Sequence, residues 1–263
     1  MLGKLFKYEF RAEGRILVPV YGATVLLSVI SSIMSRFMYG DMTSFTAVRI
    51  LSLCLTVLFG LLVAATVVMS FAASVMRFKT GMLDSEGYVT HTLPVQPWQN
   101  VAAKVLCSVV YQVIAMFVIA VSAFVFTVIA AGGIDIDFAD LGKLFSFLLQ
   151  KFGGANIALY TAEGIVFTLL TLIQTNTMFY ASLSCGHAFN SGKTAKSIGF
   201  FIGFYVLSQF INGSILTALY ATGVTSYTTP HLAFLGLICL QLFYSTLYFS
   251  VTSYCMKNRL NLQ

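Results

Sequence analysis

A glycine-containing run in the second half of the sequence carries some of the residues that bind phosphate. Residues 186–194 read Gly-His-Ala-Phe-Asn-Ser-Gly-Lys-Thr. A phosphate-binding loop has four residues between its first glycine and the Gly-Lys-Thr, and it follows a buried strand. Here five residues intervene, and an apolar segment of helical length precedes them. We therefore expect no nucleotide site on this chain, and we assign Lys193 and Lys196 to a loop whose charges set the topology.

Ionisable and amide side chains inside apolar segments form a second group of candidates. Glu163 is the one acid within a predicted membrane span, and an ionisable residue there is a functional hypothesis by default. It could line the outward part of a substrate path or pair across a dimer, or it could be a protonated or water-exposed acid near the interface. Amides in spans bond across helices or line wet cavities. The candidate path residues are Glu163, Gln174, Asn176, Gln209 and Asn212, and further amides in or near spans are Gln112 and Gln241.

Residues for hydrolysis or metal binding form no recognisable pattern. The three histidines, at positions 91, 187 and 231, fall in different loops or loop edges, and neither H-E-x-x-H nor G-x-S-x-G occurs. The five cysteines lie in or at the ends of apolar segments without a C-x-x-C pair, so we interpret them as small buried hydrophobes. The sequence therefore predicts no catalytic residue, no metal ligand and no cofactor on this chain.

The loop 77–104 holds the best candidate for a docking site. Asp84, Ser85 and Glu86 can begin a short helix, because aspartate and serine cap helices and glutamate suits a first turn. Leu93-Pro94-Val95 then ends such a helix and places apolar surface on the water side. Acidic and apolar residues exposed together indicate a surface for a partner protein. The alternative is a plain connection between two spans.

The elements that must position these residues follow from composition. The chain has 263 residues, of which 58% are apolar and 9% charged, and its mean hydropathy is +0.88. Soluble domains carry about 25% charged residues, so an ordinary soluble enzyme, a disordered chain and a disulfide-stapled secreted domain are excluded. Long apolar segments without alternation favour membrane helices over a β-barrel. We predict an all-α integral membrane protein with six spans, at 16–35, 50–76, 101–131, 156–184, 198–220 and 231–254.

Lysine and arginine are sorted between the two sides of this topology. The N-terminus, the loops 77–104 and 185–197 and the C-terminus hold eleven of them, whereas the other side holds four. Because cytoplasmic loops are enriched in these residues, both termini are predicted to be cytoplasmic. The net charge of +6 is then a property of the cytoplasmic face, and no nucleic-acid partner is needed to explain it.

Two amphipathic segments lie outside the predicted spans. In residues 1–14, apolar side chains recur at helical spacing opposite three cations, which predicts a short helix in the cytoplasmic interface near anionic headgroups. Gly14 would then let the chain turn into the first span, and the alternative is a basic flank that only sets topology. Residues 137–152 repeat apolar residues at i, i+3, i+4 and i+7 and predict an extracellular helix, either a lid or a structural belt.

The loop and the N-terminal segment together resemble a known family. Glu86-Gly-Tyr-Val89, followed by Thr92-Leu-Pro94 and then Lys104, is similar to the first cytoplasmic loop of bacterial ATP-binding-cassette (ABC) exporter permeases. These are the permeases with six spans and a separate ATPase chain. Their usual residue at position 89 is leucine, and valine stands here. The start Leu5-Phe-Lys-Tyr-Glu-Phe10 resembles the N-terminal elbow helix of the same family.

The resemblance implies one transmembrane permease domain over residues 1–263, with a coupling helix at about 84–96 in a groove of the ATPase. It implies two ATPase subunits per complex, which bind ATP and Mg, and a second permease subunit in a homodimer or heterodimer. It also implies the bacterial cytoplasmic membrane as the location. The implied coupling residues are Asp84, Ser85, Glu86, Gly87, Tyr88, Thr92, Leu93 and Pro94, and the implied interfacial residues are Leu5, Phe6, Lys7, Tyr8 and Phe10.

The predicted function is that of a permease subunit of an ABC-type exporter. It would move a hydrophobic or amphipathic substrate, such as a peptide, a drug or a lipid, with energy from ATP hydrolysis on the partner. The chain itself is not predicted to be an enzyme. The alternative is a non-transport membrane scaffold, or an immunity or assembly protein, that binds a cytoplasmic partner through loop 77–104. An intramembrane enzyme is disfavoured because the catalytic patterns are missing.

Overall fold

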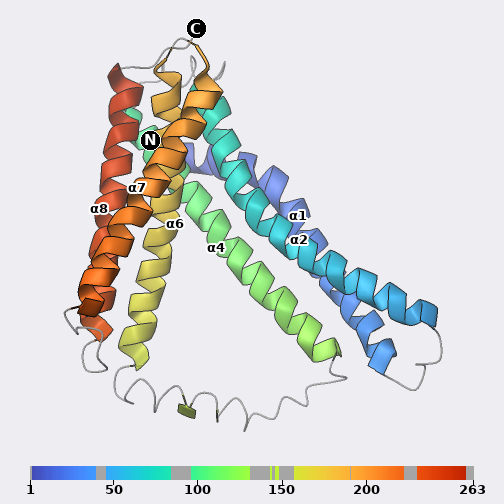
Figure 1. Ribbon diagram of the computed structural model, residues 1–263. Coiled ribbons are helices and arrows are strands. Elements are labelled where there is room, and N and C mark those ends of the chain that lie inside the picture. The colour runs from blue at the N-terminus through green and yellow to red at the C-terminus, as the bar shows by residue number, and fades with distance from the viewer. Residues whose placement is uncertain are drawn as a thin grey trace. The chain divides into compact units, whose positions relative to one another are not determined.

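The structure, a computed structural model, describes residues 2–39, 46–83, 96–130, 143, 146–147, 157–189, 191–221 and 230–258. Six long helices account for nearly all of these residues, and no strand occurs among them (Figure 1). A π-helical turn, η1 (Lys79–Leu83), continues the second helix. The six helices are α1 (Leu2–Tyr39), α2 (Thr46–Phe78), α4 (Pro97–Ala130), α6 (Ile157–His187), α7 (Lys193–Ala221) and α8 (Pro230–Asn258).

All six helices are long and apolar enough to cross a membrane. This confirms the prediction of an all-α architecture with six candidate spans, and it is compatible with a multi-pass membrane protein. The helices are longer than the predicted spans; α1, for example, has 38 residues, whereas about 20 suffice to cross the hydrocarbon. The ends of the helices therefore extend beyond the apolar stretches that indicated them. The side of the membrane on which each terminus lies stays a prediction.

Gly14 lies inside α1, and the turn predicted there is absent because the helix continues through it. The glycine has another use, which is close packing. A Cβ atom at this position would meet the hydroxyl group of Tyr111 and lie 3.3 Å from its Cζ atom. The interfacial position of residues 1–14 stays a prediction. Of the amphipathic segment 137–152, only Lys143, Ser146 and Phe147 are among the described residues.

The chain divides into two compact units. One unit comprises Met1–Phe10, Ser74–Val109 and Asn156–Gln263, and the other comprises Arg11–Ala73 and Val110–Ala155. Helices α6, α7 and α8 belong wholly to the first unit, whereas α1, α2 and α4 each contribute to both. This grouping does not test the prediction of one permease domain.

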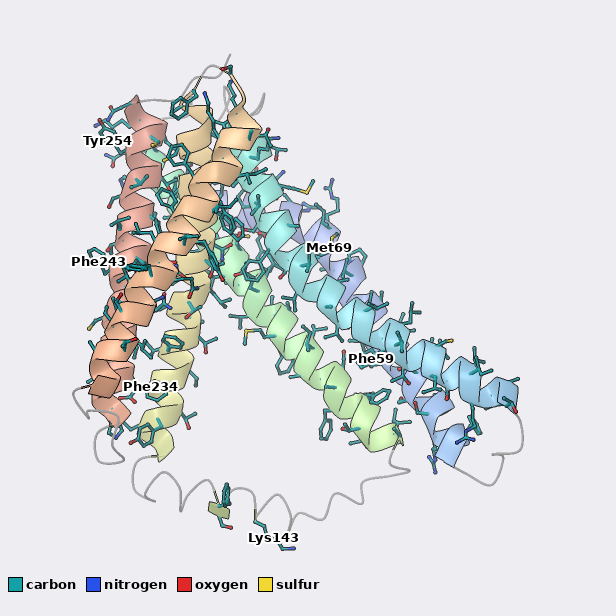
Figure 2. The ribbon with its side chains drawn as sticks, in the orientation of Figure 1. Phe59, Met69, Lys143, Phe234, Phe243 and Tyr254 are labelled. Carbon is teal, nitrogen blue, oxygen red and sulfur yellow. The ribbon has the colours of Figure 1, made fainter. Side chains whose placement is uncertain are left out.

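The second unit is held by hydroxyl groups and aromatic rings. Thr24 of α1 and Thr66 of α2 share a buried hydrogen bond of 2.8 Å between their hydroxyls. Further buried serines along α1 donate to backbone carbonyls three or four residues earlier in the same helix, as Ser28 does to Val25. The ring of Phe59 stacks on that of Phe126 with the centroids 5.4 Å apart (Phe59 is labelled in Figure 2). Small polar residues at such helix contacts let backbones approach closely.

The first unit is organised around α6, with α7 and α8 running beside it (Figure 1). Its main core joins the end of α2, the start of α4, α6 and α8, and the ring of Phe78 stacks on Tyr180 at 4.0 Å between centroids. The surface is apolar: α8, for example, exposes Phe243 and Tyr254 (Figure 2). Large apolar side chains are exposed, whereas many serine and threonine hydroxyls are buried. This distribution is the reverse of that in soluble proteins and fits a lipid environment.

Candidate functional site

The predicted coupling helix lies outside the described residues. This applies to all eight of its residues: Asp84, Ser85, Glu86, Gly87, Tyr88, Thr92, Leu93 and Pro94. Both flanks of that segment are described. Met82 and Leu83 on one side and Val101 and Val105 on the other are buried in the same apolar cluster. The two ends of the loop are therefore anchored in one core.

Three charged side chains meet beside these flanks. A carboxylate oxygen of Glu9, Oε1, accepts a hydrogen bond from Nζ of Lys104 at 2.6 Å, and its other oxygen, Oε2, accepts one from Nη2 of Arg77 at 3.2 Å. The Lys104 ammonium also donates to the backbone carbonyl of Arg77 at 3.2 Å. The Lys104 side chain is only 5% exposed. We call Glu9, Arg77 and Lys104 the ionic junction.

The ionic junction joins the beginning of α1 to the end of α2 and the start of α4. A buried cation is costly unless it is paired, so Glu9 is the group that makes the inward position of Lys104 tolerable. Since Arg77 precedes the predicted coupling helix and Lys104 follows it, Glu9 bridges both flanks of that segment. Any displacement of one flank is therefore resisted by the other flank and by residues 2–10.

The residues predicted to form an interfacial helix lie in the same stretch of α1. Phe6 and Phe10 stack with their ring centroids 5.8 Å apart, and Leu5 is half-buried. Lys7 and Tyr8 are exposed, Tyr8 by 77%. An apolar stripe beside exposed polar side chains is what an interfacial helix requires.

A second polar cluster is buried between α2, α4 and α6. The hydroxyl of Ser74 donates to Oδ1 of Asn176 at 2.8 Å and lies 2.7 Å from the hydroxyl of Tyr180, which is 3.0 Å from that of Ser108. Nδ2 of Asn176 donates to the carbonyl of Leu172 at 2.8 Å. Asn176 and Tyr180 have no exposed surface. We call Ser74, Ser108, Asn176 and Tyr180 the closed network, because its hydrogen-bonding groups are used within the protein.

A polar cavity of about 300 Å³ lies between α6, α7 and α8. It brings together three of the five predicted path residues, and Gln241 joins them from α8. We call it the amide cavity. Its lining consists of Thr171, Gln174, Thr175, Met178, Phe179, Phe201, Tyr205, Ser208, Gln209, Asn212 and Gln241.

The hydrogen-bonding capacity of the amide cavity comes from its amides. The hydroxyls of Thr171, Thr175 and Ser208 donate to backbone carbonyls of their own helices and are thereby used. By contrast, Oε1 of Gln241 is buried without a hydrogen-bond partner among the described residues. Oδ1 of Asn212 accepts only a long bond, 3.4 Å, from a tyrosine hydroxyl on α8. The cavity thus retains donors and acceptors for another molecule.

The electrostatics of the amide cavity are simple, because none of the described residues that line it carries a charge. Its apolar wall includes Phe179 of α6 and Phe201 of α7, whose rings stack with centroids 4.6 Å apart. Tyr205 continues this aromatic wall along α7. The arrangement can hold a neutral group that forms hydrogen bonds on one side and apolar contacts on the other.

The remaining two predicted path residues lie elsewhere. Asn176 belongs to the closed network. Glu163 lies within hydrogen-bonding distance of His231 of α8, whose Nδ1 is 3.3 Å from each carboxylate oxygen. The ring of Tyr160 stacks on the imidazole at 4.1 Å between centroids. Glu163 thus has a partner within its own chain. The two residues lie near the beginnings of α6 and α8.

The run 186–194 comes close to a phosphate loop, and its described residues, all but Asn190, include the end of α6 and the start of α7. A Cβ atom on Gly186 would collide with Ser197, at 2.5 Å from its backbone nitrogen and 2.6 Å from its Cα, so α7 crosses directly over this glycine. Gly192 has φ of +66°, a left-handed conformation that suits glycine. These two glycines are explained by the geometry of the turn.

Sequence reasoning missed several residues that the structure places at these sites, including Ser74, Ser108 and Tyr180 of the closed network. Glu9, Arg77 and His231 were not proposed to act, and Gln241 was noted only as an amide near a span. A signal existed for the ionic junction, because Lys104 falls inside the predicted third span, where a cation needs an anion. No comparable signal in the sequence pairs Glu163 with His231, which lie 68 positions apart.

Comparison with known proteins supplied no relative: no protein-family model, no curated protein and no solved structure matched this chain.

Proposed function

We propose that this chain is the transmembrane permease subunit of an ABC-type exporter in the bacterial cytoplasmic membrane. It would export a hydrophobic or amphipathic substrate, with both of its termini in the cytoplasm. Six helices of spanning length and a membrane-type surface support the proposal. So do the loop residues Glu86-Gly-Tyr-Val89 and Thr92-Leu-Pro94, which resemble the coupling loop of that family.

The observation that carries the proposal is the ionic junction. In the proposed mechanism, residues 84–96 sit in a groove of a separate ATPase, where ATP and Mg bind. Closure of the two ATPase subunits on ATP then pushes this segment. Glu9 links Arg77 and Lys104 on its two flanks, so the end of α2, the start of α4 and the start of α1 would move together. A ligand-driven change needs contacts that differ between the two states, and in this mechanism residues 84–96 would make those contacts with the ATPase.

The proposed assembly contains two ATPase subunits and two permease subunits, identical or different. Residues 2–10 would lie in the cytoplasmic interface as an elbow helix that carries Glu9. Substrate would pass along α6, α7 and α8, where the amide cavity provides polar contacts at membrane depth. The Glu163–His231 pair, on α6 and α8, would lie closer to the outer face of the membrane than the amide cavity does.

The proposal expects an ATPase with its own phosphate-binding loop to be encoded beside this chain, and the test is co-expression of the two, followed by purification and reconstitution in vesicles. We expect ATP hydrolysis to drive substrate across the membrane. Tyr88→Ala in the loop and Glu9→Gln in the ionic junction should each lower coupled transport about tenfold, equivalent to about 1.4 kcal/mol. Tyr254→Ala, which alters an exposed tyrosine of α8, is the matched control and should leave transport unchanged.

The competing functions give different results in the same experiment. If the ATPase binds and hydrolyses ATP but nothing crosses the membrane, the chain is a scaffold or an assembly or immunity protein rather than a permease. If no ATPase binds, the coupling role of residues 84–96 is wrong as well.

A further inference from the structure

The amide cavity holds polar groups at the depth where they are most costly. Gln174, Gln209 and Gln241 lie near the middle of α6, α7 and α8, respectively. At that depth neither lipid tails nor bulk water can satisfy an amide, and unsatisfied polar groups are strongly disfavoured. Three helices each place an amide side chain in this one cavity. The arrangement therefore indicates a ligand that completes the hydrogen bonds of these amides.

The unmet capacity includes both donors and acceptors. Each primary amide offers two N–H donors and a carbonyl acceptor. No hydrogen bond joins the side chains of Gln174 or Gln209 to another described residue, and Oε1 of Gln241 is buried and unpartnered within the same part of the chain. A matching ligand must likewise present donors and acceptors close together.

The absence of charge among the described lining residues narrows the ligand class. A lipid headgroup phosphate or a free carboxylate would find no cation here, and an acyl tail would leave the amides unsatisfied. A peptide group has one N–H and one C=O and is neutral, so it meets both requirements. The aromatic wall of Phe179 and Phe201 and the side chain of Met178 suit an apolar peptide side chain.

The size of the cavity agrees with a short segment. Ligand pockets range from about 300 to 1,000 Å³, and the amide cavity, at about 300 Å³, lies at the lower end. It can hold one or two residues of a chain, with the remainder outside. The half-exposed ring of Tyr205 and the exposed amide of Gln209 mark the open side, through which a longer chain could continue.

We propose that the amide cavity binds an uncharged peptide segment, with the side chains of Gln174, Gln209, Asn212 and Gln241 bonded to its backbone amides. As a statement about the exported substrate this rests on the proposed function, whereas binding itself does not. A hydrophobic peptide is then the substrate class, and the cavity holds part of its backbone during transit.

The test is equilibrium binding of radiolabelled N-acetyl-leucyl-leucinamide to the purified full chain in lipid nanodiscs, without ATP or ATPase. We expect saturable binding that Gln174→Leu and Gln209→Leu each weaken about tenfold. Gln209→Asn, which keeps the amide but shortens it, should weaken binding by a smaller factor. Gln99→Leu, which alters an amide at the start of α4 outside the cavity, is the matched control and should bind like the wild type.

The same assay contains the outcomes that would overturn the proposal. Absence of saturable binding, or equal binding by the cavity variants when size-exclusion chromatography shows them folded, would overturn it. So would equally strong competition by the ester analogue that lacks the backbone N–H, by sucrose or by phosphatidylglycerol. Dipeptide binding without ATP-driven transport would refute the proposed function alone. ATP-driven transport of another compound, with no dipeptide binding, would refute the peptide cavity alone.

Discussion

Asn176 and Gln174 lie two positions apart on α6, and the structure gives them opposite surroundings. Asn176 is fully buried in the closed network, where Ser74 donates to its side chain. Gln174 lines the amide cavity, and its side chain has no hydrogen bond to another described residue. Two residues correspond to 200° around a helix, so their side chains project from nearly opposite faces.

The comparison shows that an amide inside a membrane span can serve two purposes. On one face of α6, the amide is satisfied by the protein and stabilises the packing of α2, α4 and α6. On the other face, the amide of Gln174 has no hydrogen-bond partner among the described residues, which lowers stability and leaves binding capacity. The contrast predicts that changes on the closed side affect stability, whereas changes on the open side affect ligand binding.

The largest effect is expected in the ionic junction, the charged counterpart of the closed network. Glu9→Gln leaves the Lys104 ammonium without its carboxylate and should lower the free energy of unfolding by about 3 kcal/mol, as for a broken buried ion pair. Unfolding in mixed detergent micelles measures this. Lys7→Gln, at an exposed position of the same helix, should change stability by less than about 0.5 kcal/mol. Equal effects of the two substitutions would show that the junction is not a closed unit.

The two amides of α6 give the next largest difference. Asn176→Leu leaves the hydroxyl of Ser74 with fewer partners in a fully buried place and should cost about 2 kcal/mol. Gln174→Leu removes no side-chain hydrogen bond within the described protein and takes away an unsatisfied amide, so it should raise the free energy of unfolding by about 1 kcal/mol. Parallel unfolding curves of the two variants measure the contrast. If Gln174→Leu were the more damaging substitution, the assignment of the two faces would be reversed.

A smaller effect is expected for the phenol group in the closed network. Tyr180→Phe keeps the ring that stacks on Phe78 but removes the hydroxyl that contacts Ser74 and Ser108. We expect a loss of about 1 kcal/mol, which is typical of a net hydrogen bond. Thermal unfolding in detergent tests this value. A loss near zero would indicate that the serine hydroxyls find equivalent partners.

The smallest effect is expected for a phenol beside the amide cavity. The hydroxyl of Tyr244 donates to Oδ1 of Asn212 over 3.4 Å, at the long end of hydrogen bonding. Tyr244→Phe should therefore change the free energy of unfolding by less than about 0.5 kcal/mol, measured beside Tyr180→Phe under identical conditions. A loss as large as that of Tyr180→Phe would mean that Asn212 is tightly held and the cavity is less open than described.

The six spans could be predicted because the hydrocarbon thickness imposes a minimum length of apolar helix, and charges rarely occur within it. The structure confirms all six as helices of spanning length. The ends of the helices could not be predicted equally well, since residues such as Leu2 and Tyr39 extend α1 beyond any apolar requirement. The turn at Gly14 was a wrong prediction, because a glycine in a helix can equally serve close packing, here against Tyr111.

The candidate site was predictable only in part. Polar residue type and depth indicated Gln174, Gln209 and Asn212, and the structure brings these three together. The same criteria also selected Asn176 and Glu163, because residue type does not reveal which side of a helix meets a neighbour. That information comes from packing between α6, α7 and α8. The partners Glu9 and His231 depend likewise on contacts between residues far apart in the sequence.

The ionic junction also constrains how the protein is made. Lys104 is synthesised 95 residues after Glu9. At about 5–20 residues per second, this leaves an interval of about 5–20 s. Until Arg77 has been made, 68 residues after Glu9, the carboxylate has to remain where water can reach it, since a lone charge is strongly disfavoured in an apolar setting. The contact with Lys104 can form only after the start of α4 has been synthesised, so the ionic junction is completed by a residue made long after residues 2–10.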